Sequence, residues 1–394
     1  MGILTLSDQL ESIDRTKVSL ASIRCLHTLD SQSSCRDCYS ICPVSAIKVG
    51  KPPILEIEKC QNCLACLPVC PVGAFTADDD VSDLLACVPR VDNAGIELVC
   101  ARHPSPAIGL SINNIGIQTK ACLAGLGVGA YLMLYASGQT EVYVNVVSCK
   151  DCEWRSLEQQ VLDQVDRSNK FFSALESAVV VTLIQQSEIL VERTLWPANN
   201  LPLTRRDLFQ LMAKRAQVAV ARALDKGATA TIHSPGKDRM RMISAFSHLP
   251  GFTHPEDKLT SEANFAFLEI TTSCTACAAC TNACPTLALT FEKEEVDNKF
   301  RIFFAAERCI GCDLCDRVCG ADAIRIDHEP SISQIFEHQQ PIVIYSGDLD
   351  RCTHCGSQMA KRTNISLCTI CDYRKKNPFG NDIPSKIIRQ IKSK

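Results

Sequence analysis

The chain has 394 residues, with 41 Lys and Arg, 44 Asp and Glu, and 25 Cys. A net charge of −3 provides no strongly basic surface, so we expect no nucleic acid as a partner. The odd number of cysteines argues against a framework made of disulfides alone, and almost all of them stand in Cys-x-x-Cys-type groups, which have metal-ligand spacing. Because such thiols must stay reduced, a cytoplasmic location is expected.

The first expected block, residues 1–78, carries a cysteine group made of two stretches. "KCQNCLACLPVCP" (Lys59–Pro71) has the pattern Cys-x2-Cys-x2-Cys-x3-Cys-Pro, whereas "SCRDCYSICP" (Ser34–Pro43) has only three cysteines. In this pattern three thiolates on a tight loop hold three irons of one cluster, and the fourth cysteine ligates the other cluster. Gln32 stands where the first stretch lacks its cysteine.

The missing ligand has one candidate, Cys25, which lies ten residues before Cys35 across the polar run "LHTLDSQSS". A loop inserted at the surface would leave this thiol free to reach the iron. The alternative is that Cys25 is buried and inert, which would leave a three-iron cluster or a ligand other than cysteine, such as Asp37.

Residues 79–195 alternate strand-like and helix-like patterns, which predicts a parallel sheet with helices on its faces. Strand-like runs occur at Ile96–Val99, Glu141–Val147 and Ala178–Ile184, and a helical pattern covers Trp154–Glu176. The uncharged run Ala121–Gly138 is barely long enough to span a bilayer. We therefore predict a buried helix there and no integral membrane segment.

Five cysteines of this block stand outside the two motifs: Cys87, Cys100, Cys122, Cys149 and Cys152. Several of them follow strand-like runs, and the carboxyl ends of parallel strands meet at one edge of a sheet. Three or four thiols could therefore converge at that edge. The alternative is that they are ordinary buried cysteines of an α/β core.

Two further features of the block are assigned structural roles. "GLGVG" (Gly125–Gly129) has no strand running directly into it and no acidic residue at the right distance, so we attribute it to helix packing rather than to nucleotide binding. His103 lies in a loop beside a proline and is expected at the surface.

The expected connector, residues 196–262, contains one basic amphipathic helix beginning at "TRRDLF" (Thr204–Phe209), with Thr204 as its N-cap. The later stretch "HSPGKDRMRM…HLPGFTHPEDK" is predicted to be a loop because of its Pro and Gly residues.

Residues 263–330 repeat the plan of the first cysteine group. "CTACAACTNACP" (Cys274–Pro285) and "CIGCDLCDRVCG" (Cys309–Gly320) flank a predicted hairpin of two short strands. In residues 331–394, two Cys-x2-Cys knuckles separated by twelve residues fit one tetrahedral S4 site, formed by Cys352, Cys355, Cys368 and Cys371. We predict structural zinc, with rubredoxin-like iron or another cluster as the alternative, and His354 as a bystander.

Both cysteine groups resemble the bacterial-type two-cluster ferredoxin family. The resemblance implies four [4Fe–4S] clusters with cross-ligation between the two motifs of each group. The implied ligand sets are Cys25, Cys35, Cys38 and Cys70, where [3Fe–4S] is the alternative; Cys42, Cys60, Cys63 and Cys66; Cys274, Cys277, Cys280 and Cys319; and Cys284, Cys309, Cys312 and Cys315.

The segment Cys122–Cys152 is similar to the delta subunit of methyl-viologen-reducing hydrogenase and to the related domain of heterodisulfide reductase. That family has a cysteine, a helix ending in glycine, a strand and a closely spaced cysteine pair. The resemblance implies a [2Fe–2S] or other cluster on Cys100, Cys122, Cys149 and Cys152, with Cys87 left over, and a role in joining electron-transfer complexes.

The predicted fold is therefore a multidomain α+β and α/β protein, in which two ferredoxin-like two-cluster modules flank a central α/β domain and a small zinc-ribbon-like segment follows. The predicted function is that of a non-catalytic subunit that relays single electrons between a donor and an acceptor, in a stable complex with redox partner proteins. One alternative is a self-contained oxidoreductase acting through the middle domain, with or without a flavin. A less favoured one is an iron–sulfur or zinc protein that acts in assembly or sensing.

Overall fold

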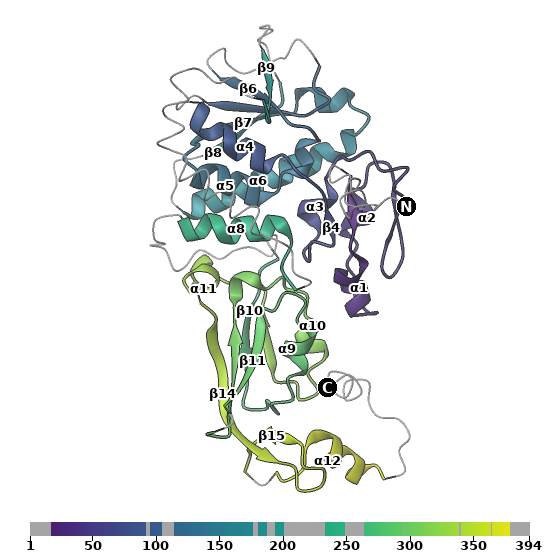
Figure 1. Ribbon diagram of the computed structural model, residues 1–394, viewed down its shortest axis with the longest axis vertical. Helices are drawn as coiled ribbons and strands as arrows, with labels where there is room; N and C mark the ends of the chain where they lie inside the picture. Colours follow the sequence, from purple (N-terminus) through teal and green to yellow (C-terminus); the bar gives the residue numbers. More distant parts are fainter. Residues whose placement is uncertain are drawn as a thin grey trace, which may run out of the picture. The chain divides into compact units, whose positions relative to one another are not determined.

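The structure is a computed structural model that describes residues 17–91, 95–104, 114–175, 180–186, 194–200, 233–248, 264–294, 296–338, 340–363 and 365–378 (Figure 1). The chain divides into two compact units. The first comprises residues 1–28, 34–229 and 236–249, and the second comprises residues 29–33, 230–235 and 250–394. Helices and strands occur together in both units. The predicted basic helix beginning at Thr204 lies outside the described residues.

The cysteine-rich part of the first unit is built from short elements. Two antiparallel strand pairs, β1 with β4 and β2 with β3, frame it. In chain order the elements are β1 (Ser19–Leu20), the 3-10 turn η1 (Ser22–Arg24), α1 (Leu26–Leu29), α2 (Asp37–Ile41), β2 (Ile47–Lys48), β3 (Ile54–Leu55), α3 (Cys66–Val69) and β4 (Phe75–Thr76). Helices α2 and α3 each end at a cysteine followed by Pro43 or Pro71, since proline has no N–H for the next helical turn.

The rest of the first unit contains a five-stranded parallel sheet, as the alternating sequence pattern predicts. Its strand order is β8-β7-β5-β6-β9, and every neighbouring pair is parallel. The strands are β5 (Ile96–Val99), β6 (Ile115–Gln118), β7 (Glu141–Asn145), β8 (Val180–Ile184) and β9 (Leu195–Pro197). The chain passes from β5 to one neighbour and then crosses to the other, so the carboxyl ends of β5, β6 and β7 form the switch point at which such sheets bind ligands.

Helices and 3-10 turns accompany this sheet, and α5 and α6 form two of the connections between its strands (Figure 1). They are α4 (Val81–Cys87), η2 (Val88–Arg90), η3 (Leu123–Gly125), α5 (Val128–Ala136), η4 (Val147–Asp151), η5 (Arg155–Leu157) and α6 (Glu158–Ala174). All residues of α5 from Val128 to Leu134 are buried, which confirms the buried helix predicted there. None of the helices in the described residues is long and apolar enough to span a membrane.

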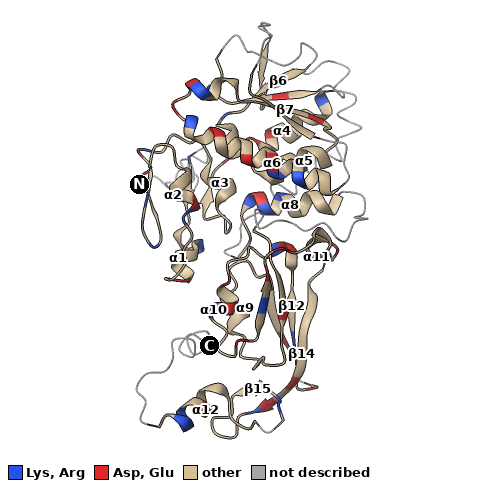
Figure 2. Ribbon diagram, turned by 180° about the vertical axis from the view of Figure 1, so that it is seen from behind, with Lys and Arg blue, Asp and Glu red and all other residues tan. Residues whose placement is uncertain are grey.

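The predicted loop after residue 233 is wrong in part, because α8 (Lys237–His248) is a helix (Figure 2). Arg239, Met242, Ala245 and Phe246 are buried on it, at the spacing of one helical face. Pro235 and Gly236 therefore stand directly before the start of this helix rather than in a continuous loop.

Two glycines of "GLGVG", Gly127 and Gly129, pack against α8, in agreement with the assignment to helix packing. A Cβ on Gly127 or Gly129 would collide with Asp238 at the start of α8. Burial raises the pKa of the Asp238 carboxyl, while the nearby backbone N–H groups of Gly129 and Ala130 act to lower it. The amino end of α5, where a phosphate would bind in a nucleotide site, is thus occupied by a carboxylate of the chain itself.

The second unit contains the second cysteine group and the four-cysteine segment. Strands β10 (Phe267–Ile270) and β13 (Ile324–Asp327) pair antiparallel. A separate sheet has the order β11-β12-β14-β15, formed by β11 (Leu289–Glu294), β12 (Lys299–Phe304), β14 (Ile342–Arg351) and β15 (Gln358–Ala360). The antiparallel pair β11–β12 confirms the predicted hairpin. The helical elements are α9 (Ala279–Ala283), η7 (Ala306–Arg308), α10 (Leu314–Arg317), α11 (Ile332–Phe336) and α12 (Thr369–Lys376).

The long strand β14 joins the four-cysteine segment to the ferredoxin-like part. Its first part pairs with β12 and its last three residues pair with β15. Phe300 of β12 packs between Phe291 and Tyr345, at ring-centroid distances of 5.6 and 5.8 Å. The two cysteine-containing parts of this unit therefore share one sheet, and these aromatic side chains lie on its strands β11, β12 and β14.

Candidate metal centres

The thiols of the first predicted ligand set lie together in the first unit. Burial, followed by the charges of Cys70, Cys35 and Cys25, raises the pKa of the Cys38 thiol to about 12. Burial together with Asp37, Cys70 and Cys25 raises the pKa of Cys35 to about 11. Such mutual repulsion disfavours four free thiolates and is relieved when a positively charged metal group binds them.

Hydrogen bonding around Arg24 defines the place of Cys25. Arg24 is buried, and it donates from Nε and Nη2 to the carbonyl oxygen of Val72, at 3.0 and 2.6 Å. Val72 lies two residues after Cys70, the fourth cysteine of the other motif. Cys25 follows Arg24 directly, so this contact holds Cys25 beside Cys70.

The second unit has the same arrangement around a cysteine of a regular motif. Arg308 directly precedes Cys309 and donates from Nε to the carbonyl oxygen of Thr286, at 3.0 Å. Thr286 lies two residues after Cys284, which belongs to the same predicted ligand set as Cys309. Cys25 and Cys309 thus each follow an arginine that donates to the carbonyl oxygen two residues after a motif cysteine.

The alternative ligand Asp37 lies beside the same set. Its carboxylate Oδ2 is 3.9 Å from Cys35 Sγ. Gln32, which stands at the regular sequence position of the missing cysteine, is exposed. Asp37 therefore stays an alternative ligand beside the thiols, whereas Gln32 lies at the surface.

The second predicted set lies next to the first. Burial raises the pKa of Cys66, and the charges of Cys63, Cys60 and Cys70 raise it further. Burial also raises the pKa of Cys63, with added effects of Cys42 and Cys60. Because Cys66 interacts with Cys70 of the first set, the two candidate cluster sites are neighbours.

The second unit repeats this pairing. Burial raises the pKa of Cys280, and Cys277, Cys274 and Cys319 raise it further. Burial raises the pKa of Cys315 well above its ordinary value, with contributions from Cys309, Cys280, Cys312 and Cys284. The structure thus brings together both predicted sets of this unit and makes them adjacent through Cys280 and Cys315.

Four cysteines of the middle domain line one pocket at the carboxyl edge of the parallel sheet. They are Cys100, Cys122, Cys149 and Cys152, which come from the segments that follow β5, β6 and β7. Burial, with Cys100, Cys149 and Cys63, raises the pKa of Cys122 to about 12. Trp154, Leu157 and Val161 make the lining partly apolar, and Arg102, Ser148 and Glu158 add polar groups to it.

Cys87 and His103 stand apart from this pocket's four thiols. Cys87 is buried and donates to the carbonyl oxygens of Asp83 and Ala198, at 3.3 and 3.1 Å. His103 is buried and its Nδ1 lies 3.2 Å from the Ser148 hydroxyl, so the prediction of a surface histidine is wrong. The tight turn that begins at Cys100 folds His103 inward, against the turn that carries Ser148.

The middle pocket adjoins the second ligand set of the ferredoxin-like part. The charge of Cys63 contributes to the raised pKa of Cys122. Gly125 packs closely against Leu64, since a Cβ added to Gly125 would lie only 2.9 Å from the Leu64 Cβ. Trp154 Nε1 donates to Gln61 Oε1 at 2.7 Å, and the Arg102 guanidinium lies 4.0 Å from the centre of the Trp154 ring. Sequence reasoning missed these contacts, since no local pattern marks Arg102, Trp154 or Gln61.

The four-cysteine segment has the geometry of a site for a single ion. The sulfur atoms of Cys352, Cys355, Cys368 and Cys371 all lie within 4.8 Å of one another. Cys355 Sγ and Cys368 Sγ are 3.7 Å apart, and tetrahedral geometry with Zn–S bonds of about 2.3 Å places thiolates about 3.8 Å apart. Backbone N–H groups, that of Cys368 first, lower the pKa of Cys352 to about 6. His354 is exposed and is not part of the set.

Comparison with known families agrees with part of this assignment. The family "4Fe-4S dicluster domain" matches residues 273–323, and "4Fe-4S binding domain" matches residues 53–76. A comparison with curated proteins found no match. The proposed resemblance of the middle domain to a hydrogenase delta subunit receives no support from these comparisons. The chain therefore carries two ferredoxin-type domains that bind 4Fe–4S clusters, and such domains indicate electron transfer.

Proposed function

We propose that the chain relays single electrons between a donor and an acceptor protein within a larger complex. The observation that carries this proposal is the continuity of cysteine sites in the first unit. The set containing Cys25 adjoins the set containing Cys63 through Cys66 and Cys70, and Cys63 in turn adjoins the middle pocket through Cys122. Adjacent redox sites are what a relay needs, whereas isolated structural clusters need no such continuity.

The donor chemistry of each site fits the proposed group. Thiolate sulfur is the usual ligand of iron–sulfur clusters, which would supply reversible one-electron chemistry when bound. The part of the protein is to hold the thiols in place, to restrict water and to fix the spacing of the sites. The partly apolar lining of the middle pocket serves the second of these purposes.

The first test is the iron, sulfide and zinc content per chain after purification without oxygen. Four four-iron clusters with one metal ion at the four-cysteine site give about sixteen iron and one zinc, and a cluster in the middle pocket raises the iron to about eighteen to twenty. Cys122→Ala should lower the higher value by about two to four, whereas the control Cys87→Ala should leave it unchanged.

Two results would contradict the proposal. Fewer than about sixteen iron atoms per chain, by a wide margin, would mean that the four clusters the proposed relay needs are not all present. Steady turnover of a small substrate by the isolated chain, with a bound flavin, would replace the relay by a self-contained oxidoreductase. Electron paramagnetic resonance of the reduced chain adds an independent check, since adjacent reduced clusters should show magnetic coupling.

A further inference from the structure

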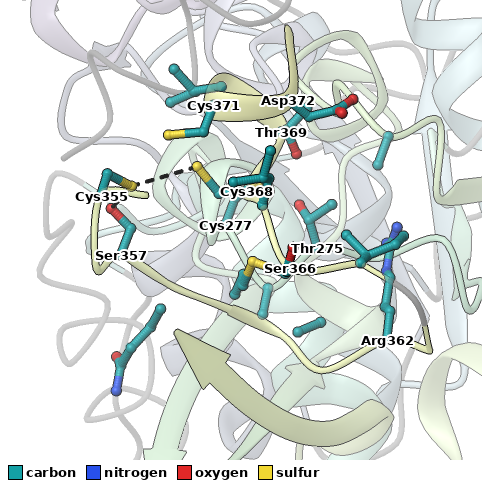
Figure 3. A pocket seen from close by; sticks show the side chains of 18 of the residues that line it. Thr275, Cys277, Cys355, Ser357, Arg362, Ser366, Cys368, Thr369, Cys371 and Asp372 are labelled. Atoms are coloured by element: carbon teal, nitrogen blue, oxygen red, sulfur yellow. Dashed lines mark hydrogen bonds between the residues drawn. The ribbon is translucent and has the colours of Figure 1, made fainter. Parts of the chain in front are cut away.

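A basic groove lies in the second unit between the loop around Cys277 and the four-cysteine segment (Figure 3). Its volume is about 950 Å³, which is within the usual range of binding sites. One wall is formed by residues 273–278, and the other by residues 355–376 of the four-cysteine segment. A molecule in this groove would contact the wall that carries Cys277, a member of a predicted cluster ligand set.

The two walls are joined by hydrogen bonds, so the groove is a fixed feature of the fold. The backbone N–H of Ala360 donates to the carbonyl oxygen of Thr275 at 3.0 Å. Arg362 Nη2 donates to the carbonyl oxygen of Ser273. Figure 3 shows Arg362 and Thr275 from the two walls beside each other.

Basic side chains outnumber acidic ones in the groove lining, although the chain as a whole is slightly acidic. Its lining includes five basic side chains and one acidic one: Lys293, Arg362, Arg374, Lys375, Lys376 and Asp372. Only Lys376 is paired with Asp372, at 2.8 Å, among the ion pairs that the described residues show here. Arg374 and Lys375 are exposed in the last turn of α12, which is blue in Figure 2.

Two residues that line the groove each have a buried hydrogen-bond donor without a partner among the described residues. A guanidinium carries five N–H donors, and the Nε of Arg362 has no acceptor among the described residues. Thr275 Oγ1, on the facing wall, also lacks a partner there. Both groups can donate hydrogen bonds, which carboxylate oxygens accept.

The remaining lining favours an extended peptide over a flat organic cofactor. Apart from its charged residues, it consists of Ser, Thr, Gln and Asn, of Ala, Leu, Ile and Met, and of four cysteines from the candidate metal sites, Cys277, Cys355, Cys368 and Cys371; none of its described residues is aromatic. Pockets for small cofactors are usually lined by apolar and aromatic side chains. Hydroxyl and amide groups can instead pair with the backbone and carboxylates of an acidic segment.

We propose that this groove docks an acidic segment of a redox partner protein and thereby places the partner beside the Cys277 site. The inference rests on the proposed relay function, which requires an acceptor or donor at this module. Complementary charge would speed the encounter and would make it dependent on ionic strength.

The test uses a short fluorescent peptide of alternating Glu and Gly, with a Gln and Gly peptide as the neutral probe. Binding to the metal-loaded full chain is followed by fluorescence anisotropy. The Glu peptide should bind at about 20 mM salt and dissociate at about 500 mM, and the Gln peptide should not bind. Lys293→Glu combined with Arg374→Glu should weaken binding about tenfold or more.

The matched control reverses two exposed basic residues of the same unit that lie outside the groove lining, Lys299→Glu with Arg325→Glu. Equal losses in the two double variants, or no binding of the Glu peptide at low salt, would overturn the proposal. Zinc, iron and reduction by dithionite are measured in every variant. If the chain lacks clusters but binds the Glu peptide, the proposed electron relay is refuted and the docking groove is supported. If the chain carries its clusters but does not bind the peptide, only the docking proposal is refuted.

Discussion

Replacing Asp79 by Asn tests how α8 is held on the first unit. The Asp79 carboxylate lies 2.7 Å from Arg241 Nη2, and the two side chains are only 3% and 6% exposed. Lys237 lies 3.2 Å from the same carboxylate but is 35% exposed, so it contributes little. Removing one partner of a buried ion pair costs about 3–5 kcal/mol, since the other charge stays buried without compensation.

The neighbouring Asp238 carboxyl should reduce the loss of stability in Asp79→Asn to the lower end of that range. Burial raises its pKa and the charge of Asp79 raises it further, while Arg241 lowers it. Without Asp79, Asp238 ionises more readily and offsets part of the Arg241 charge. We therefore expect a loss of about 3 kcal/mol at pH 7, which corresponds to a melting temperature lower by roughly 6–12 °C for a unit of this size.

The pH dependence has a definite sign. Burial opposes ionisation of Asp79, but Arg241 and Lys237 hold its pKa below the ordinary value. Its stabilising effect is thus complete above the unfolded pKa of about 4 and is lost as the pH falls through the folded pKa. The difference in melting temperature between the natural chain and Asp79→Asn should persist above about pH 5 and should narrow below about pH 4.

Intrinsic fluorescence is the assay, because both tryptophans of the chain, Trp154 and Trp196, belong to the first unit. Asp83→Asn is the matched control, since Asp83 pairs with Lys120, which is 52% exposed, and its loss should cost less than about 1 kcal/mol. Equal shifts for the two variants, or a shift at Asp79 of only one or two degrees, would refute the reasoning about buried charge.

Three further predictions concern the metal centres. Cys25→Ala should leave three thiols at its site and lower the iron content by about one atom per chain, because a three-iron cluster forms. The control Cys87→Ala should leave the iron content unchanged. An unchanged iron content in Cys25→Ala would show that Cys25 is not a ligand. Arg24→Gln should lower the reduction potential of the same cluster in a redox titration, because a buried positive charge beside Cys70 favours the reduced state, and Arg36→Gln, an exposed control, should not. Cys368→Ala should abolish zinc binding at the four-cysteine site and His354→Ala should retain it; zinc retained by Cys368→Ala would place the ion elsewhere.

The spacing of residues along the chain was sufficient to predict those structural features that depend on residues close in sequence. The motifs beginning at Cys60, Cys274 and Cys309 form a loop and a helical turn ending at or near their fourth cysteine, as their sequence predicts. The hairpin between the motifs of the second group and the buried helix α5 were also predicted, since each depends on residues close in sequence. Cys25 could only be proposed as a candidate, because its motif is interrupted and its position depends on the contact between Arg24 and Val72.

Long-range packing decided the rest. The convergence of Cys100, Cys122 and Cys149 depends on strand order, which brings the ends of β5, β6 and β7 to one edge of the sheet. The helix α8 was concealed by the Pro and Gly residues around it, and its buried face is defined by packing against α5. Sequence periodicity records which residues prefer to be buried, whereas the partner that buries them, and hence the neighbours of each thiol, is determined only when distant segments pack together.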